Sequence, residues 1–310
     1  MFLKKRKVNN TLYWSLAENH REGTKIKQRV IMNLGTTDRA IQKLSADNQY
    51  GHFLTKIVNE EVRPVDNVNE LWDQVFNENC LLGMKRIPDH TIDMIFCDLP
   101  YATTNNHWDS LIPLEPLWKE YKRIIKDNGA IVLTAQTPFD KILANSNLDM
   151  LRYEWIWEKT TATGHLNAKK MPMKAHENVL VFYKKLPTYN PQKTTGHKPV
   201  NSYTKRQNDG SNYGKIKVGI TGGGSTERYP RSVLTFATDK QKLAIHPTQK
   251  PESLVEYFIK TYSNEGDLIL DNAWGSGTTG VVCKKNNRRF LGFEKDKDIY
   301  LSSLERLSNM

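Results

Sequence analysis

The chain has 310 residues, of which 38% are hydrophobic, so it is long enough to bury one large core. No apolar run approaches the roughly 18 residues of a membrane-spanning helix, and the basic N-terminus is not followed by the apolar stretch of a secretory signal. We therefore expect a soluble, cytoplasmic protein. The net charge of +11 favours a polyanionic partner such as nucleic acid.

The three cysteines are far apart in the sequence and form no pair at metal-ligand spacing. We expect Cys80, Cys97 and Cys283 to be reduced, buried thiols. His246 precedes a proline and has no neighbouring ligand types, so we interpret it as a turn-forming or cofactor-side residue. No metal site is expected.

Residues 1–60 are predicted to form a small basic accessory module. Leu12–Leu16 and Ile26–Ile31 alternate in polarity on either side of a glycine-containing turn, which is typical of a β-hairpin. A helix is expected from Asp38, a residue type that caps helices. Residues 1–30 hold eight Lys or Arg and two Glu, so the module is either an accessory DNA-binding arm or a solvated basic hairpin. It also faintly resembles the N-terminal modules of some transposases.

From about residue 70 the pattern changes to alternating strands and helices, which predicts a catalytic α/β domain over residues 61–310. Several strands are apolar on both faces and therefore belong in a sheet that helices cover on both sides. Trp155 and Trp157 alternate on one strand and are expected in the core. The expected strands span residues 92–97, 130–133, 153–157, 179–183, 268–270 and 290–293, and the expected helices span residues 114–126, 251–262, 278–285 and 297–307.

The strand at residues 92–97 ends in the sequence Asp98-Leu99-Pro100-Tyr101, and ligands of open α/β sheets bind at the carboxyl ends of strands. This tetrapeptide suits chemistry on an exocyclic amino group of a base, whose lone pair is delocalised into the ring. The Asp98 carboxylate and a backbone carbonyl held by Pro100 would accept the amino hydrogens and stabilise the positive charge that develops on nitrogen. Tyr101 would stack on the base after it leaves the duplex. The alternative is an Asp-Pro turn with a buried tyrosine.

Residues 184–231 are polar and rich in glycine, serine, asparagine and threonine. The segment holds ten Lys or Arg and two acidic residues. A solvated linker would show the same polarity, but the basic excess and the interleaved tyrosines favour contact with nucleic acid. These tyrosines are Tyr189, Tyr203, Tyr213 and Tyr229.

A glycine-rich turn lies between an expected strand and an expected helix near the C-terminus. Gly275, Gly277 and Gly280 fit the pattern GxGxxG, in which the backbone passes close to a ligand and directs amides at it from the helix N-terminus. The next strand ends in Glu294, at the interval of about 20 residues at which a carboxylate binds ribose hydroxyls. The two features predict a nucleoside-bearing cofactor, either NAD or S-adenosylmethionine. The alternative is a structural glycine turn beside an exposed carboxylate.

Together these motifs resemble the amino-methylating DNA methyltransferases, in the group whose catalytic tetrapeptide precedes the cofactor loop. The resemblance covers roughly residues 70–310. Asp98–Tyr101 is similar to the family's catalytic motif, Asp271–Gly280 to its cofactor motif, and His246–Pro251 to the motif that completes the methionine end of the cofactor site. Smaller matches follow in the family's order, at Thr137-Pro138-Phe139, Trp157-Glu158-Lys159 and Glu177-Asn178.

The resemblance implies a Rossmann-like sheet that binds S-adenosylmethionine, with residues 184–231 as a target-recognition insertion and double-stranded DNA as the substrate. The catalytic residues that it implies are Asp98, Pro100 and Tyr101. The cofactor-binding residues that it implies are Asp271, Trp274, Gly275, Ser276, Gly277, Thr278, Thr279, Glu294, Thr248 and Lys250.

Two positions depart from the family's pattern. Leu99 stands where proline is commoner, which should be tolerated because its neighbours carry the expected contacts. Asn272-Ala273-Trp274 replaces Pro-x-Phe, so Trp274 would take the aromatic role in the cofactor loop. Because cytosine-N4 relatives more often carry serine at the first catalytic position, Asp98 favours adenine N6 as the target.

Other functions stay open at this point. The same enzyme could act on cytosine N4 or on RNA. The fold could instead serve a DNA-binding regulator, although the intact catalytic motif speaks against this. An NAD dehydrogenase would fit the glycine loop alone, but the chain shows no evident hydride-transfer residues. The sequence alone does not determine which DNA site is recognised, whether the protein forms a homodimer, or whether it has a restriction endonuclease partner.

Overall fold

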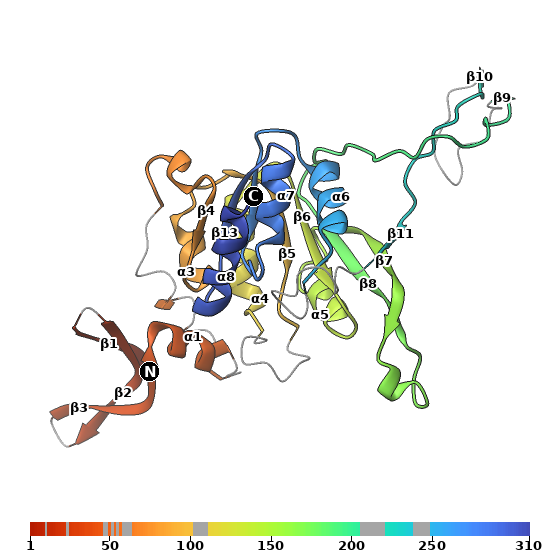
Figure 1. Ribbon diagram of the computed structural model, residues 1–310. Helices are drawn as coiled ribbons and strands as arrows, with labels where there is room; N and C mark the ends of the chain where they lie inside the picture. Colours follow the sequence, from red (N-terminus) through yellow and green to blue (C-terminus); the bar gives the residue numbers. More distant parts are fainter. Residues whose placement is uncertain are drawn as a thin grey trace.

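The structure is a computed structural model that describes residues 1–9, 11–22, 25–45, 49–50, 53, 56–57, 64–101, 111–204, 221–237 and 249–310. It contains a large sheet, a small N-terminal sheet and a two-stranded ribbon (Figure 1). The N-terminus lies in the small sheet, whereas the C-terminus lies on the main body beside the large sheet (Figure 1).

The large sheet has eight strands in the order β11-β7-β8-β6-β5-β12-β13-β4. Strands β5 and β12 are parallel neighbours, with Ile95 opposite Leu270. Their carboxyl ends, together with that of β13, therefore meet along one side of the sheet, which is termed the carboxyl edge. The strands are β4 (Gln74–Phe76), β5 (Ile92–Asp98), β6 (Ile125–Ala135), β7 (Leu151–Thr163), β8 (Lys174–Phe182), β11 (Val233–Phe236), β12 (Leu268–Asp271) and β13 (Arg289–Phe293).

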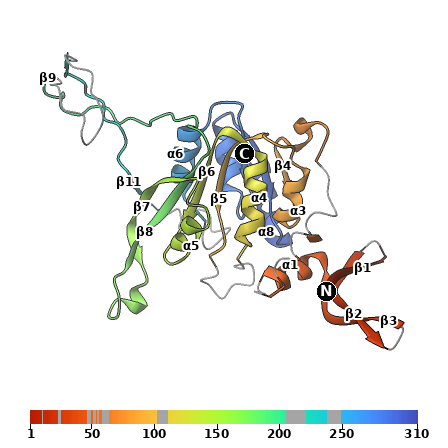
Figure 2. The same cartoon turned by 180° about the vertical axis from the view of Figure 1, so that it is seen from behind.

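Strand β8 is antiparallel to both of its neighbours, and the other adjacent strands of the large sheet pair in parallel. Central parallel strands are buried on both faces, which explains the continuous apolar character of β5 and β12. The β7–β8 hairpin extends past the carboxyl edge, and a short 3-10 helix at His165–Asn167 lies near its tip (Figures 1 and 2).

Helices cover both faces of the large sheet (Figures 1 and 2). Helix α4 (Leu114–Ile124) shows the amphipathic pattern behind this packing, because Leu117, Tyr121 and Ile124 recur at helical spacing and are buried. A short 3-10 helix at Val68–Leu71 precedes β4, and another at Met84–Arg86 follows α3 (Cys80–Gly83). One face packs against α3 (Cys80–Gly83), α4 (Leu114–Ile124) and α5 (Phe139–Asn145), and the other against α6 (Glu252–Tyr262), α7 (Thr278–Lys285) and α8 (Lys297–Ser308).

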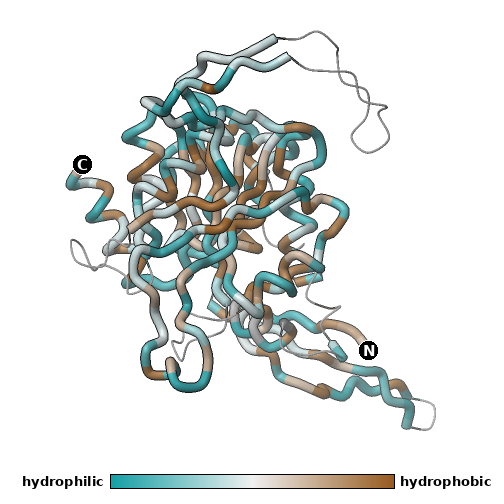
Figure 3. Tube along the Cα trace, turned by 90° about the vertical axis from the view of Figure 1, so that its right-hand side faces the viewer, coloured by the Kyte–Doolittle hydropathy of each residue, from teal (hydrophilic) through white to brown (hydrophobic). Residues whose placement is uncertain are grey.

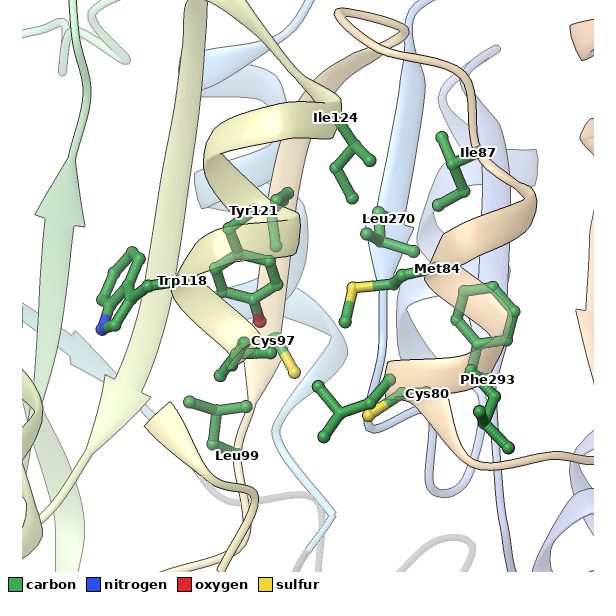
Figure 4. Close-up of a cluster of buried hydrophobic side chains, with 14 of the residues drawn as sticks. Cys80, Met84, Ile87, Cys97, Leu99, Trp118, Tyr121, Ile124, Leu270 and Phe293 are labelled. Carbon is green, nitrogen blue, oxygen red and sulfur yellow. The ribbon is translucent and has the colours of Figure 1, made fainter. Parts of the chain in front are cut away.

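The sheet divides the hydrophobic core into two layers. Hydrophobic residues gather in the main body, whereas the projecting segments are mainly hydrophilic (Figure 3). In the layer under α4, Tyr121 and Cys97 lie side by side (Figure 4). All three cysteines are buried and free, and Trp155 and Trp157 are buried, as predicted.

The N-terminal sheet consists of β1 (Phe2–Val8), β2 (Thr11–Glu22) and β3 (Lys25–Thr36), paired antiparallel in that order. The predicted hairpin is confirmed as β2 and β3, and β1 is an additional strand. Helix α1 (Thr37–Ser45) begins one residue before the expected cap. The indole of Trp14 donates a hydrogen bond to the Thr37 hydroxyl at 3.0 Å, which ties the sheet to α1.

The described part of residues 184–231 lies at the other end of the large sheet from the carboxyl edge (Figure 1). It carries the ribbon of β9 (Tyr203–Thr204) and β10 (Thr221–Gly222), and it leads into β11, which pairs with β7. Residues 205–220 lie outside the described residues. The role of this segment in target recognition stays a prediction.

The predicted fold class is confirmed, because a mixed sheet carries helices on both faces. Every expected strand and helix is present, with ends that differ by a few residues. The short elements β4, β11, α3 and α5 were not expected. Among the helices of the described residues, none is both long and apolar enough to cross a membrane.

Candidate active site

Asp98 ends β5 at the carboxyl edge, and 29% of its side chain is exposed. Its Oδ1 accepts hydrogen bonds from the Tyr101 hydroxyl at 2.7 Å and from the Thr134 hydroxyl at 2.5 Å. Thr134 lies opposite Asp98 on the neighbouring strand β6. Two adjacent strands thus fix the orientation of a carboxylate that remains partly open to solvent.

A buried ammonium occupies the other side of this carboxylate. Lys250 Nζ lies 2.8 Å from Asp98 Oδ2 and 3.0 Å from Glu177 Oε2. Glu177 Oε1 in turn lies 2.6 Å from Lys159 Nζ. The side chains of Lys159, Glu177 and Lys250 are only 8%, 10% and 10% exposed. These four residues, which come from β5, β7, β8 and the segment before α6, are termed the charge network.

The charges of this network stabilise one another against burial. Burial disfavours the ammonium of Lys250, but the carboxylates of Asp98 and Glu177 raise its pKa well above the usual value. Burial also opposes ionisation of Glu177, but Lys250 and Lys159 lower the pKa of that carboxyl. Removing one member would leave a buried charge without its partner, which is costly.

Tyr101 lies beside the Asp98 carboxylate and packs against a second aromatic ring. Its ring stacks on Phe139 with centroids 5.3 Å apart and planes inclined by 28°. Lys250 Nζ lies 5.5 Å from the centre of the same ring. Burial and the nearby Asp98 raise the pKa of Tyr101 well above its usual value, so the hydroxyl stays protonated and can donate to Asp98. Pro100, which is half-buried, joins these two residues through the chain.

A surface cavity lies beside the charge network. Glu177 forms part of its wall, together with residues that follow β6 and residues at the start of β8. The cavity therefore places an opening next to the pair formed by Lys250 and Glu177. Its remaining lining residues are Gln136, Thr137, Pro172, Met173, Lys174, His176 and Asn178.

The loop between β12 and α7 has the backbone form of a ligand-binding turn. Gly275 and Gly277 have φ values of +56° and +76°, a conformation that side chains disfavour. Gly277 immediately precedes α7, so the first amides of that helix face the loop. A Cβ at Gly275 would meet only the Ala273 carbonyl, at 3.8 Å, so the turn leaves room for another molecule there.

Asp271 fixes this loop from within. Its side chain is 5% exposed, and it accepts hydrogen bonds from the Thr279 hydroxyl at 2.6 Å and the Ala273 amide at 3.2 Å. Burial raises the pKa of Asp271 from 3.8 to about 7, although these hydrogen bonds favour the charged form. Asp271 therefore sets the shape of the loop without being open to solvent.

Glu294 follows β13 and faces the glycine turn. The Gly275 amide donates to its Oε2 at 2.9 Å, and the Asp296 amide donates to its Oε1 at 2.9 Å. Burial raises the pKa of Glu294. A carboxylate after one strand and an open glycine turn after its neighbour are the groups that hold the ribose of a nucleoside cofactor. These residues fit S-adenosylmethionine.

Trp274 supports the turn from the core. Its indole is 2% exposed and donates a hydrogen bond to the Ser303 hydroxyl at 3.1 Å. Added Cβ atoms at Gly280 and Gly292 would lie only 2.5 Å and 2.2 Å from this ring, so both glycines are needed for its packing. The expected contact of Trp274 with the cofactor stays a prediction.

Arg306 of α8 holds the same loop in place through hydrogen bonds. No pattern in the sequence predicted this role. Its Nη1 donates to the Ser276 carbonyl at 3.1 Å and to the Thr278 hydroxyl at 3.0 Å. Its Nη2 pairs with Glu252 of α6 at 2.6 Å. Ser276 and Thr278, both expected at the cofactor site, are thus held in place by a buried arginine.

The two predicted sites lie at one edge of the sheet, because β5 and β12 are neighbours. Lys250, which was expected at the cofactor site, contacts Asp98 and Glu177. The sequence matches around Lys159 and Glu177 indicated that these positions matter, but they did not predict the ion pairs. Thr248 and His246 lie outside the described residues.

Comparison with known families decides the class of this protein. Residues 92–305 match the family described as DNA methylase. The chain belongs to the DNA methylase family. The match runs from β5 into α8 and so includes both the catalytic and the cofactor motif. The prediction of an amino-methylating DNA methyltransferase that uses S-adenosylmethionine is confirmed.

Similar curated proteins are DNA methyltransferases. Type II methyltransferase M.HinfI of Haemophilus influenzae is 27% identical over 266 residues, which are 75% of this chain and 67% of that protein. DNA adenine methyltransferase YhdJ of Escherichia coli (strain K12) is 27% identical over 257 residues, 75% of this chain and 82% of that protein. Type II methyltransferase M.HpaI of Haemophilus parainfluenzae is 29% identical over 245 residues, 74% of this chain and 73% of that protein.

Solved structures share the fold. The M1.HpyAVI–SAM complex has a TM-score of 0.51 and 22% identity, over 76% of this chain and 99% of that one. The PvuII DNA methyltransferase (cytosine-N4-specific) has a TM-score of 0.54 and 14% identity, over 76% of this chain and 90% of that one. The Rossmann-like fold expected from the sequence is thereby confirmed.

The N-terminal segment is similar to a different family. Residues 3–49 match the N-terminal domain of IS1634 family transposases. This match includes β1, β2, β3 and α1 and ends well before the DNA methylase match begins. The boundary near residue 60 between an accessory module and a catalytic domain stays a prediction.

Proposed function

We propose that this protein is a site-specific adenine-N6 methyltransferase of double-stranded DNA. The observation that supports it most is the place of Asp98. This carboxylate is partly exposed, is oriented by Thr134 and Tyr101, and ends the strand beside the one that carries the cofactor loop. When bound at that loop, S-adenosylmethionine supplies an electrophilic methyl group.

The residues around Asp98 act on the amino group of the base. Asp98 accepts one amino hydrogen, and a backbone carbonyl held by Pro100 accepts the other, which localises the lone pair on nitrogen. Tyr101, already stacked on Phe139, provides an aromatic surface for a base that has left the duplex. As the nitrogen gains positive charge, the nearby carboxylate stabilises it, and the proton that the nitrogen loses passes through Asp98 to solvent.

Two features support adenine as the target base. The first catalytic position is an aspartate, Asp98, rather than a serine. One similar protein carries the name DNA adenine methyltransferase, which is the second feature. Two others are named type II methyltransferases, and these names support a restriction–modification role. A cytoplasmic location, a homodimer and an endonuclease partner stay predictions.

The test is to incubate the purified protein with unmethylated genomic DNA and S-adenosylmethionine, and then to sequence the product with a method that reads modified bases. We expect N6-methyladenine at one recurring motif, which also gives the recognition sequence. N4-methylcytosine at a motif would overturn the choice of base and leave the class of enzyme intact. Absence of any modified base would overturn the proposed function.

A further inference from the structure

We infer that one face of the N-terminal sheet binds the phosphate backbone of duplex DNA beside the catalytic site. This role rests on the proposed function, because it assumes that DNA lies along the carboxyl edge. Three observations support it. They are the absence of carboxylates from one face of the described strands, the exposure of the side chains on that face, and the position of the sheet.

The register of the strands assigns side chains to the two faces. Residues opposite each other in paired strands point to the same side, and successive residues alternate. Lys4 lies opposite Ser15, and Arg6 lies opposite Tyr13. Trp14, which is buried and tied to α1, stands between Ser15 and Tyr13 and therefore points to the other side. Lys4 and Arg6 thus project away from the face that is anchored to the rest of the protein.

The remaining strands continue this surface. Arg21 is opposite Ile26 and Ala17 is opposite Val30, on the same side as Tyr13 by the alternation along β2. Tyr13, Ile26 and Val30 are 43%, 70% and 45% exposed. The surface is termed the outer face and consists of Lys4, Arg6, Tyr13, Arg21, Ile26 and Val30.

Both glutamates of the sheet fall on the opposite face. Glu18 lies opposite Arg29, and Glu22 lies opposite Lys25 in the register. Glu22 also forms an ion pair with Lys27 at 2.6 Å. Within the described strands, the outer face therefore carries basic side chains and no carboxylate, whereas the opposite face carries both glutamates among its five basic side chains, which are Lys5, Lys7, Lys25, Lys27 and Arg29.

This composition suits a nucleic acid better than a solvated surface. Basic side chains on phosphates release the counterions of DNA, and this release supplies most of the sequence-independent affinity. Exposed aromatic and aliphatic side chains among the charges add contact area, as in nucleic-acid-binding surfaces.

The position of the sheet matches a duplex bound for catalysis. It projects beside the carboxyl edge on the flank of β4 and β13, and the β7–β8 hairpin projects on the other flank (Figures 1 and 2). Trp14, Leu16 and Leu34 share one hydrophobic cluster with Leu99, which follows the catalytic aspartate. The N-terminal sheet is therefore joined to the main body through the hydrophobic layer that contains Leu99, and we expect a duplex that extends past the carboxyl edge on this flank to meet it.

The test compares two variants of the full chain that lose the same charges. Lys4→Ala/Arg6→Ala changes the outer face, and Lys25→Ala/Arg29→Ala removes one lysine and one arginine from the opposite face of the same sheet. The dissociation constant for a short fluorescent DNA duplex is measured over a range of salt concentrations. For the outer-face variant we expect the slope of log affinity against log salt to become shallower by about 2, and binding near 0.1 M salt to weaken roughly tenfold. The control variant should bind like the unchanged protein.

Each other outcome overturns the inference. Equal losses in both variants would mean that only net charge matters, and unchanged slopes in both would mean that the sheet does not contact DNA. Thermal unfolding of all three proteins verifies that the fold is kept. The proposed function and this inference can fail separately. If the protein methylates no base but only the outer-face variant loses duplex binding, this inference stands. A methylating protein whose outer-face variant binds normally would refute it.

Discussion

The neighbouring strands β5 and β12 both end in an aspartate, but the two carboxylates have different surroundings. Asp98 is 29% exposed, and its partners are two hydroxyls and the ammonium of Lys250. Asp271 is 5% exposed, and its donors, Thr279 and Ala273, belong to its own loop and the helix that follows. Both carboxylates lie at the carboxyl edge, but solvent reaches that of Asp98 far more readily than that of Asp271.

In the proposed mechanism, this difference separates a residue that acts on substrate from one that shapes a binding loop. A carboxylate must be accessible and able to accept further hydrogen bonds if it is to meet an amino group. Asp98 meets this condition, and Asp271, enclosed by its own loop, does not. Substitutions at the two positions should therefore have different effects, the first on catalysis and the second on folding stability.

The largest effect is expected for Asp98→Ala. Loss of the acceptor that stabilises charge on the amino nitrogen should lower the rate of methyl transfer by about a thousandfold. The substitution also removes one of the two carboxylates that pair with the buried Lys250, so the melting temperature should fall, and activity is compared at a temperature at which the variant is folded. The measurement is transfer of a labelled methyl group to DNA, with S-adenosylmethionine binding by calorimetry as the control. Retention of full activity would show that Asp98 does not accept the amino hydrogen.

The second effect is a pH dependence of stability that arises from Asp271. Its pKa is about 7 in the folded protein against 3.8 for an unperturbed aspartate. Between about pH 4 and pH 7 the unfolded chain has lost this proton while the folded protein still holds it, so stability falls as pH rises. The slope from this group is at most about 1.4 kcal/mol per pH unit.

Asp271→Asn removes this titration and keeps the size of the side chain. The free energy of unfolding, measured with urea at several pH values, should fall less steeply between about pH 4 and pH 7 in the variant than in the unchanged protein. Asp98→Asn is the matched control, because it removes an aspartate from the same edge of the sheet. If Asp271→Asn gives the same profile as the unchanged protein, Asp271 is not buried in the way described.

The sequence predicted the elements that local pattern determines. Apolar runs such as β12 and the amphipathic α4 give a strong signal within a few residues. Strand β1 was missed because four consecutive basic residues, Lys4 to Lys7, hide the alternation, and pairing with β2 makes it a strand. The parallel edge strand β11 was missed because it is short and gains its partner β7 only in the folded sheet.

The candidate site likewise contains residues that the sequence predicted and contacts that it did not. Asp98 and the glycine loop lie in compact motifs, so the residues alone indicated their chemistry. The ion pairs of Lys250 with Asp98 and Glu177 join segments that are distant in sequence, and no local pattern encodes their convergence. The same holds for Arg306, whose place under the loop depends on how α8 packs.

The smallest effect, and the one that bears most on the environment of Asp98, is expected for Glu177→Gln. Lys250 is shared between two carboxylates, so Glu177 draws part of its charge away from Asp98. Without the charge of Glu177, the Lys250 ammonium would pair with Asp98 alone. It would then compete with the amino group of the base for the Asp98 carboxylate, and its positive charge would oppose the positive charge that develops on the amino nitrogen. We expect kcat to fall about tenfold, equivalent to about 1.4 kcal/mol, with KM for DNA little changed.

Two further variants distinguish this positioning role from a loss of packing. Glu177→Asp keeps the charge and should retain most of the activity. Glu177→Gln/Lys250→Met also removes the ammonium beside Asp98 and leaves only Lys159 without its partner, so its kcat should exceed that of Glu177→Gln alone. Equal losses in Glu177→Asp and Glu177→Gln, without recovery in the double variant, would mean that Glu177 only fills space. Recovery would show that the cation beside Asp98 must be balanced for this carboxylate, unlike Asp271, to act on the substrate.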